Sequence, residues 1–241
     1  MNIPRYWHTL RHLKPVQIYG RIWFRLVRPR PDLRPAPALR SAGPSHGLWI
    51  PGGQKKSAMT GPSRFSFLNE EHEIVAQTDW NQQGRDKLWL YNLHYFDDLN
   101  AENAIDRHAW HQQLIGRWIR ENPQGAGNGW EPYPISLRVV NWIKWTLVGN
   151  RLSNEALHSL VVQIRYLTKR LEIHLLGNHL LANAKALVFA GLFFSGREAN
   201  EWVDTGLGIL SRQIPEQILS DGGHFELSPM YHAIILEDLL D

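Results

Sequence analysis

The stretch GNHLLANAKALVFAGLFF, residues 177–194, decides the fold because it is apolar on nearly every side. A helix that is hydrophobic all round is covered by neighbouring elements on more than one side. Gly177 is placed to end one helix, and the next is expected from about His179 to Phe194. We therefore predict that this helix lies inside a layered fold, as in the inner ring of a double-layered helical toroid.

The segments around this stretch predict further helices, joined by short loops that contain Gly or Pro. The expected helices run from Asp106 to just before Asn122, from Pro134 to about Gly149, from Ser153 to about Leu171 and from Arg197 to about Leu219, and a last one starts near Pro229. Asp106 and Ser153 are candidate N-caps, and Pro134 suits the first turn of its helix. Because short loops make successive helices antiparallel, we predict an all-α fold, an incomplete (α/α) toroid of antiparallel helical hairpins.

The N-terminal region differs from this helical part. Residues 1–40 hold nine Lys and Arg against one acid, and the arginines alternate with Trp, Tyr, Ile and Leu. This alternation predicts an amphipathic helix packed on its own protein. Residues 29–63 are rich in Pro, Gly and Ser and predict an irregular, extended connection, and residues 64–90 predict short extended pieces with a turn at Gln83-Gly84. We divide the chain into an N-terminal region, 1–63, and a partial toroid domain, 64–241.

The composition excludes several classes of protein. The 241 residues include no Cys, so disulfide scaffolds, cysteine zinc sites and thiol catalysis are excluded. The net charge of +3 is too small to indicate a nucleic-acid partner. No run of about 18 apolar residues exists, so we expect no transmembrane segment. The start of the chain lacks the apolar core of a signal peptide, which predicts a cytoplasmic protein, with the periplasm or cell envelope as the alternative.

The first candidate site is GAGNGWEPYPISLR, residues 125–138. Trp130, Glu131 and Tyr133 lie just before a predicted helix, and Arg138 lies about one turn into it. Aromatic rings beside an Arg and a Glu form a suitable surface for a sugar that bears a carboxylate. The alternative is a helix start whose Trp packs in the core.

Two more candidate sites lie at predicted helix starts. Asn178 and His179 open the apolar helix, where free amides and the helix dipole favour an anion. Tyr231 and His232 are adjacent at the head of the last helix and are a candidate acid/base pair. The structural alternatives are an ordinary Asn cap and a Tyr half-buried with its hydroxyl satisfied.

Other groups of polar residues give weaker indications. His94 lies in a stretch whose Leu, Tyr and Phe content indicates packing, although it is a further candidate substrate contact. The pairs His8/His12 and His108/His111 have metal-ligand spacing, but neither has an obvious carboxylate to complete a first shell. We expect no metal and no cofactor.

Five segments, taken in order, resemble the heparinase II/III-like family of polysaccharide lyases. They are HLKPVQIYGRIWFRL (12–26), NLHYFDDL (92–99), GWEPYPISLRVVNWIKW (129–145), GNHLLANAKALVFAGLFF (177–194) and DGGHFELSPMYHAIILEDLLD (221–241). The resemblance implies an (α/α) toroid followed by a C-terminal antiparallel β-sandwich. It also implies cleavage of uronic-acid-containing polysaccharides by β-elimination, which makes an acidic polysaccharide the expected partner.

The resemblance also implies roles for individual residues. Asn178 matches the Asn that neutralises the substrate carboxylate, with His179 beside it, and Tyr231 matches the catalytic Tyr, an acid and a candidate base. A free Tyr has a pKa of about 10, so Tyr231 needs a cation or hydrogen-bond donors nearby, and His232 is a candidate. Trp130, Glu131, Tyr133, Arg138 and His94 are the expected substrate contacts.

The sequence departs from the family pattern after Tyr231. It ends at Asp241, inside an apolar helix, whereas family members continue into the β-sandwich, which supplies a further catalytic His. We therefore expect a truncated lyase whose 241 residues alone are weakly active or inactive. The alternative is a non-catalytic carbohydrate-binding or assembly module that retains the cleft. A third possibility, a glycosidase, needs two carboxylates, for which Glu131 and Glu226 are the candidates.

Overall fold

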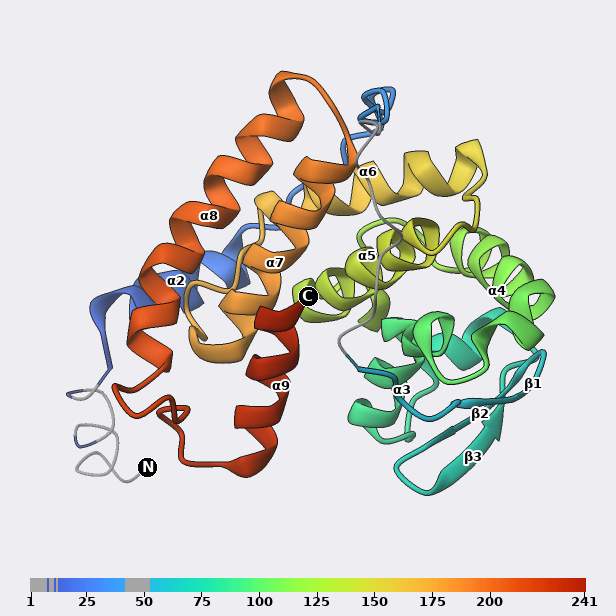
Figure 1. Cartoon of the computed structure of the whole chain (residues 1–241), viewed down its shortest axis with the longest axis horizontal. Helices are drawn as coiled ribbons and strands as arrows, with labels where there is room; N and C mark the ends of the chain where they lie inside the picture. Colours follow the sequence, from blue (N-terminus) through green and yellow to red (C-terminus); the bar gives the residue numbers. More distant parts are fainter. Residues whose placement is uncertain (1–7, 9–10, 12, 42–52) are drawn as a thin grey trace.

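A computed structural model describes residues 8, 11, 13–41 and 53–241, and over these residues the chain is mostly α-helical (Figure 1). The helices are α2 Pro15–Leu26, α3 Lys87–Tyr95, α4 His108–Glu121, α5 Pro132–Leu147, α6 Asn154–Thr168, α7 Gly177–Phe193, α8 Arg197–Gln217 and α9 Pro229–Leu240. The mainly helical fold predicted from the sequence is confirmed.

Helix α5 lies in the middle of the structure. Figure 1 shows α7, α8 and α9 on one side of it, and α3, α4 and the small sheet on the other. Helix α5 contacts α3, α6 and α7, and residues from all these helices join one large hydrophobic core. Much of that core is aromatic, and its largest fully buried side chains are those of Trp80, Trp89, Trp118, Trp142 and Trp145.

The local signals for helix ends had mixed success. The Ser153 hydroxyl accepts a hydrogen bond from the amide of Ala156 at 3.1 Å, which confirms the predicted cap of α6. Pro134 lies in the first turn of α5, as predicted. The cap at Asp106 is wrong, because this residue lies within a 3-10 turn, Ala104–Arg107, that leads directly into α4.

A three-stranded antiparallel sheet precedes the main helices. Its strands are β1 Met59–Gly61, β2 Arg64–Phe67 and β3 Glu70–Glu73, in the order β1-β2-β3. Strands β1 and β2 pair with each other on either side of residue 63, so the domain boundary that we placed after this residue falls inside a hairpin. The Asp98 carboxylate attaches this sheet to the helices, accepting from the amide of Met59 at 3.0 Å and from Nε2 of His111 at 2.8 Å.

Helix α2 of the N-terminal region contacts the helical part through Phe24, but Ile22, Trp23 and Leu26 are exposed, so most of the apolar side chains that we expected to pack there do not. Phe24 of α2 lies between the Arg170 guanidinium, 3.7 Å from its ring, and the His174 ring, 4.5 Å away. The connection has no helix over residues 27–41, and Leu39 pairs with Phe194 in an isolated β-bridge. None of the helices among the described residues is long and apolar enough to cross a membrane.

Helices α7 and α8 pack closely because glycines lie at their contact. A Cβ atom added at Gly206 would lie 2.7 Å from the carbonyl oxygen of Ala184, and one added at Gly191 would lie 2.5 Å from that of Ala199. Both distances are shorter than a carbon can tolerate, so larger residues at these positions would push the helices apart.

We therefore predict that Gly206→Ala lowers the free energy of unfolding by about 1–3 kcal/mol through overpacking. Gly208→Ala is the matched control, because a Cβ there meets nothing within 4 Å. Since Ala favours a helix over Gly, this control should be neutral or stabilising by up to about 1 kcal/mol. Urea unfolding followed by circular dichroism measures both. Equal stability of the two variants would contradict the close contact.

Candidate active site

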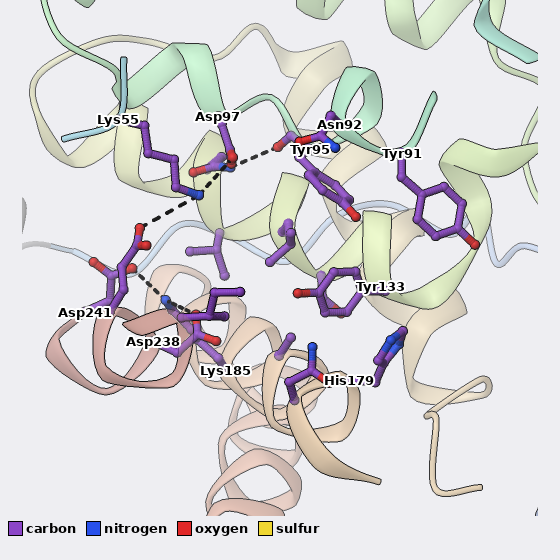
Figure 2. A pocket seen from close by; sticks show the side chains of 18 of the residues that line it. Lys55, Tyr91, Asn92, Tyr95, Asp97, Tyr133, His179, Lys185, Asp238 and Asp241 are labelled. Atoms are coloured by element: carbon purple, nitrogen blue, oxygen red, sulfur yellow. Dashed lines mark hydrogen bonds and ion pairs between the residues drawn. The ribbon is translucent and has the colours of Figure 1, made fainter. Parts of the chain in front are cut away.

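Four of the residues proposed from the sequence meet at one cavity of about 500 Å³, which lies between α3, α5, α7 and α9 (Figure 2). Tyr133 reaches it from the first turn of α5, Asn178 and His179 from the first turn of α7, and Tyr231 from the first turn of α9. Three helix starts therefore converge on the same space.

The start of α7 is held in an unusual backbone conformation. Leu176 has φ 61° and ψ −153°, a region that residues with a side chain rarely adopt, and Gly177 follows with φ 55°. Such a conformation costs of order 1–3 kcal/mol and persists only where surrounding contacts enforce it. Here the amide of Leu176 is held by the carbonyl of Glu172 at 3.1 Å. The turn aims Asn178 and His179 into the cavity.

His179 is oriented by a buried carboxylate. Its Nδ1 lies 3.1 Å from Oε1 of Glu172, and its ring lies 4.4 Å from that of Tyr133. The other oxygen of Glu172 accepts from Nδ2 of Asn183 at 3.1 Å, and Oδ1 of Asn183 accepts from the amide of Glu172 at 2.8 Å. His179 therefore has a fixed ring position, with a negative charge behind it.

Two tyrosines that line the cavity, Tyr133 and Tyr91, are neutral hydrogen-bonding groups. Burial raises the pKa of Tyr133 to about 12, with a further contribution from Asp238, although a hydrogen bond with Asn178 lowers it. Burial and the carboxylate of Glu131 raise the pKa of Tyr91, whose hydroxyl donates to that carboxylate. Figure 2 shows Tyr133 directed into the cavity, with His179 nearby. At neutral pH these phenols can therefore donate hydrogen bonds.

The other end of the cavity is lined by paired charges. Nζ of Lys144 lies 2.7 Å from Asp241, and Nζ of Lys185 lies 2.9 Å from Asp238 and 2.6 Å from Asp241. Burial alone would raise the pKa of Asp241, but Lys185 and Lys144 bring it below its usual value. A third pair, Lys55 with Asp97 at 2.9 Å, closes this end. The pairs of Lys144 and Lys185 attach the C-terminal end of α9, through Asp238 and the following Asp241, to α5 and α7.

Sequence reasoning missed these paired charges and also Glu172. One signal was present, because Lys185 is the only charged residue in the apolar stretch 177–194. A lone Lys on a buried helix needs an anionic partner, which indicates a charge pair without saying where the acid lies.

The structure corrects the role expected for Arg138. This side chain is fully buried, and its guanidinium lies 3.8 Å from the centre of the Trp118 ring. It donates to three acceptors, which are the carbonyls of His94 at 3.1 Å and Gly129 at 2.7 Å and Oε1 of Gln163 at 2.8 Å. With every face occupied by protein, Arg138 has no surface to offer a sugar.

Trp130 and His94 are core residues as well, which corrects their proposed contact with substrate. Trp130 is 3% exposed and stacks on Trp118 at 6.0 Å, so the alternative of a Trp packed at a helix start is confirmed. His94 is fully buried, and its Nδ1 accepts from Nε1 of Trp118 at 2.9 Å. Burial, and then the charge of Arg138, lower the pKa of His94 to about 3.

The remaining candidates lie outside the cavity. His232 is exposed and does not line it, and the imidazole recorded near Tyr231 is instead that of His224, with 6.4 Å between ring centres. Glu226 is also exposed, and Glu131 pairs with Lys87 at 3.1 Å. Neither glutamate lines the cavity, so the two carboxylates of a glycosidase are not brought together there.

The histidine pairs have other environments. His111 is held by Asp98, and the His108 ring stacks on Trp145 at 5.5 Å. His12 lies outside the described residues, so the pair that it forms with His8 is not described. Within the described part of the chain, no three His, Asp or Glu side chains are grouped so that they could hold a metal ion.

We predict that Arg138→Met destabilises the fold, because it leaves three buried acceptors without a donor. The free energy of unfolding should fall by about 2–5 kcal/mol. Arg120→Met, on the exposed side of α4, is the matched control and should change stability by no more than about 0.5 kcal/mol. Urea unfolding measures both. An Arg138→Met variant of normal stability that fails to bind polysaccharide would restore the substrate role.

The sequence matches proteins of one family. The family model Heparinase II/III N-terminus matches residues 69–241. A heparin-sulfate lyase of Bacteroides stercoris is 30% identical over 190 residues, covering 64% of this chain and 28% of the relative. A second, of Pedobacter heparinus, is 30% identical over 136 residues, covering 51% of this chain and 20% of that relative. A third, of Bacteroides thetaiotaomicron, is 42% identical over 66 residues, covering 27% of this chain and 9% of that relative.

No solved structure gives a significant match. The chain spans 28% of the length of the Bacteroides stercoris lyase and smaller shares of the other two. The family match nevertheless covers most of this chain, and it includes all the helices that surround the cavity. The protein therefore belongs to the heparinase II/III family, through the N-terminal part of the family's sequence.

Proposed function

We propose that the cavity is part of a polysaccharide lyase site that cleaves uronic-acid-containing chains by β-elimination. The observation that carries this proposal is the convergence of Asn178, His179, Tyr133 and Tyr231 from three helices on one space. The names of the three relatives support the reaction class, and they make heparin sulfate the first substrate to test.

The first chemical requirement is to neutralise the uronate carboxylate. The proton on C5, next to that carboxylate, is only weakly acidic, so preorganised donors that stabilise the enolate-like transition state contribute most to the rate. Asn178 lies at the start of α7, where free amides and the helix dipole favour an anion. The neutral hydroxyl of Tyr133, beside Asn178, is a second donor.

The second requirement is proton transfer. A base removes the C5 proton, the C4–O glycosidic bond breaks as the C4=C5 double bond forms, and an acid protonates the departing oxygen. We assign the acid role to Tyr231, which is also the candidate base. His179, held by Glu172, is the second candidate proton carrier on this side of the cavity. The family resemblance assigns a further His to a C-terminal β-sandwich, so activity of the whole protein is part of the proposal.

One observation favours the alternative, a carbohydrate-binding or assembly module without turnover. Lys185, which could meet an anionic sugar in the cavity, already forms ion pairs with Asp238 and Asp241 of the chain itself. Such pairing reduces the positive charge available to a substrate. The two functions differ in whether Tyr231 transfers protons.

We predict that Tyr231→Phe lowers turnover by about a hundredfold or more and leaves binding almost unchanged, because only the proton is lost. Asn178→Ala should weaken both, since it removes a contact to the carboxylate. The assay follows the ultraviolet absorbance of the 4,5-unsaturated uronate released from heparin sulfate and from alginate. Tyr19→Phe, on the exposed side of α2, is the matched control and should behave like the unchanged protein.

The assay is run on the 241-residue chain and on any longer natural form of the protein. Cleavage that survives Tyr231→Phe would remove Tyr231 from the mechanism. Cleavage without unsaturated ends would indicate hydrolysis. Binding that depends on Asn178, with no cleavage in any form, would replace the lyase proposal with the binding module.

A further inference from the structure

A second hollow, a groove of about 690 Å³, lies on the side of the molecule formed by α2. Arg21 and Arg25 of α2, Arg28 just after it, and Arg170 after α6 line this groove. We call these four residues the arginine groove. Among the described residues that line it, Glu131 carries the only carboxylate, and that group is already paired with Lys87 and Tyr91.

The groove is held in shape by contacts to the backbone of α2 and the residues after it. Nη1 of Arg170 donates to the carbonyls of Phe24 at 2.9 Å and Val27 at 2.6 Å, and its guanidinium lies over the Phe24 ring. These contacts fix α2 against the rest of the chain. Because Arg21 and Arg25 are one helical turn apart, they lie on the same face of α2 and line the groove together.

Among the described residues that line the groove, four arginines stand against one carboxylate, that of Glu131. Across the described residues, no carboxylate is recorded in an ion pair with Arg21, Arg25 or Arg28. Nε of Arg170 is buried without a hydrogen-bond partner. Burial lowers the pKa of Arg170 and the charge of Arg28 lowers it further, whereas Tyr166, Glu131 and Glu172 act in the opposite direction. Arg21, Arg25 and Arg28, which are exposed and line the groove, are therefore the groups that can bind an anion there.

The groove adjoins the cavity through one residue. Glu131 lines the groove, while its carboxylate accepts a hydrogen bond from Tyr91, which lines the cavity. The groove offers little for stacking nucleobases, because Trp130 is 3% exposed and Arg170 and His174 cover Phe24.

We propose that the arginine groove binds the carboxylate or sulfate groups of an acidic polysaccharide, outside the cavity where cleavage is proposed. Guanidinium groups suit this role, since they bind planar or tetrahedral oxyanions through two parallel hydrogen bonds. The anionic character of the ligand rests on the arginines, whereas its being a polysaccharide rests on the proposed function.

The test replaces the exposed arginines of the groove together, as Arg21→Ala, Arg25→Ala and Arg28→Ala. The matched control is the triple variant Arg120→Ala, Arg151→Ala and Arg212→Ala, which removes the same charge from exposed positions outside the groove. Calorimetry over a range of salt concentrations measures Kd for three probes: heparin sulfate, with both anions; alginate, with carboxylates; and dextran sulfate, with sulfates. Circular dichroism verifies folding, and the single variant Arg25→Ala provides a milder substitution.

We expect the groove variant to bind heparin sulfate about tenfold or more weakly, with a smaller salt dependence, because fewer charge-assisted contacts form. The control variant should bind within about threefold of the unchanged protein. Weaker binding of alginate identifies carboxylate as the ligand group, and weaker binding of dextran sulfate identifies sulfate. Unchanged binding by the groove variant, or an equal loss in both triple variants, would overturn the proposal.

Two further outcomes keep this proposal separate from the lyase. Tight binding of a single-stranded oligonucleotide that is lost in the same variant would overturn the choice of a polysaccharide. If groove-dependent binding is found without cleavage that depends on Tyr231, only the lyase proposal fails. If cleavage depends on Tyr231 while the groove variant binds normally, only the groove proposal fails.

Discussion

The buried guanidinium of Arg138 is the interaction on which the rest of the structure depends. It starts on α5 and reaches the carbonyl at the end of α3, the carbonyl of Gly129 in the Gly-rich loop, and Gln163 on α6. A buried cation without such partners would be very unfavourable, so the three acceptors and the cation hold one another in place. This arrangement fixes where α5 begins, and Tyr133 is its second residue.

The aromatic core around Arg138 gives the abundant tryptophans a structural role. Trp118 lies at its centre, where it stacks on Trp130, meets Trp142 edge to face at 6.0 Å and donates to His94. Close packing of large rings leaves little freedom to the loops between them. The rings that looked suited to bind sugars are instead the support for a cavity lined by tyrosines.

The proposed site is assembled at the starts of helices, and two sets of polar contacts hold them in register. Glu172 and Asn183 fix His179 at the start of α7, and Nδ2 of Asn183 also reaches the Ser136 hydroxyl on α5 at 3.0 Å. The pairs of Lys185 with Asp238 of α9, and of Lys144 with Asp241 just after α9, hold this helix where Tyr231 lines the same cavity. Removing one partner of such a buried pair leaves an uncompensated charge, so these contacts specify the position of α9.

The sequence by itself determined most of the helices, several of their ends and some residues of the candidate site. Local signals suffice for the cap at Ser153 and the Pro-initiated turn of α5, and Asn178 and Tyr231 were singled out because they lie at helix starts. Helix α3 was missed because its apolar residues indicated packing without a clear helical period.

Only the tertiary structure decided which polar and aromatic residues face the cavity. Arg138, Trp130 and His94 have the residue types of a sugar site, but they are buried by distant parts of the chain. The carbonyl of His94, for example, accepts a hydrogen bond from Arg138, 44 positions away. The pairing of Lys185 with Asp238, 53 positions apart, is equally invisible in the sequence. Helix periodicity and caps are set by residues a few positions apart, whereas burial and charge pairing depend on how distant segments pack.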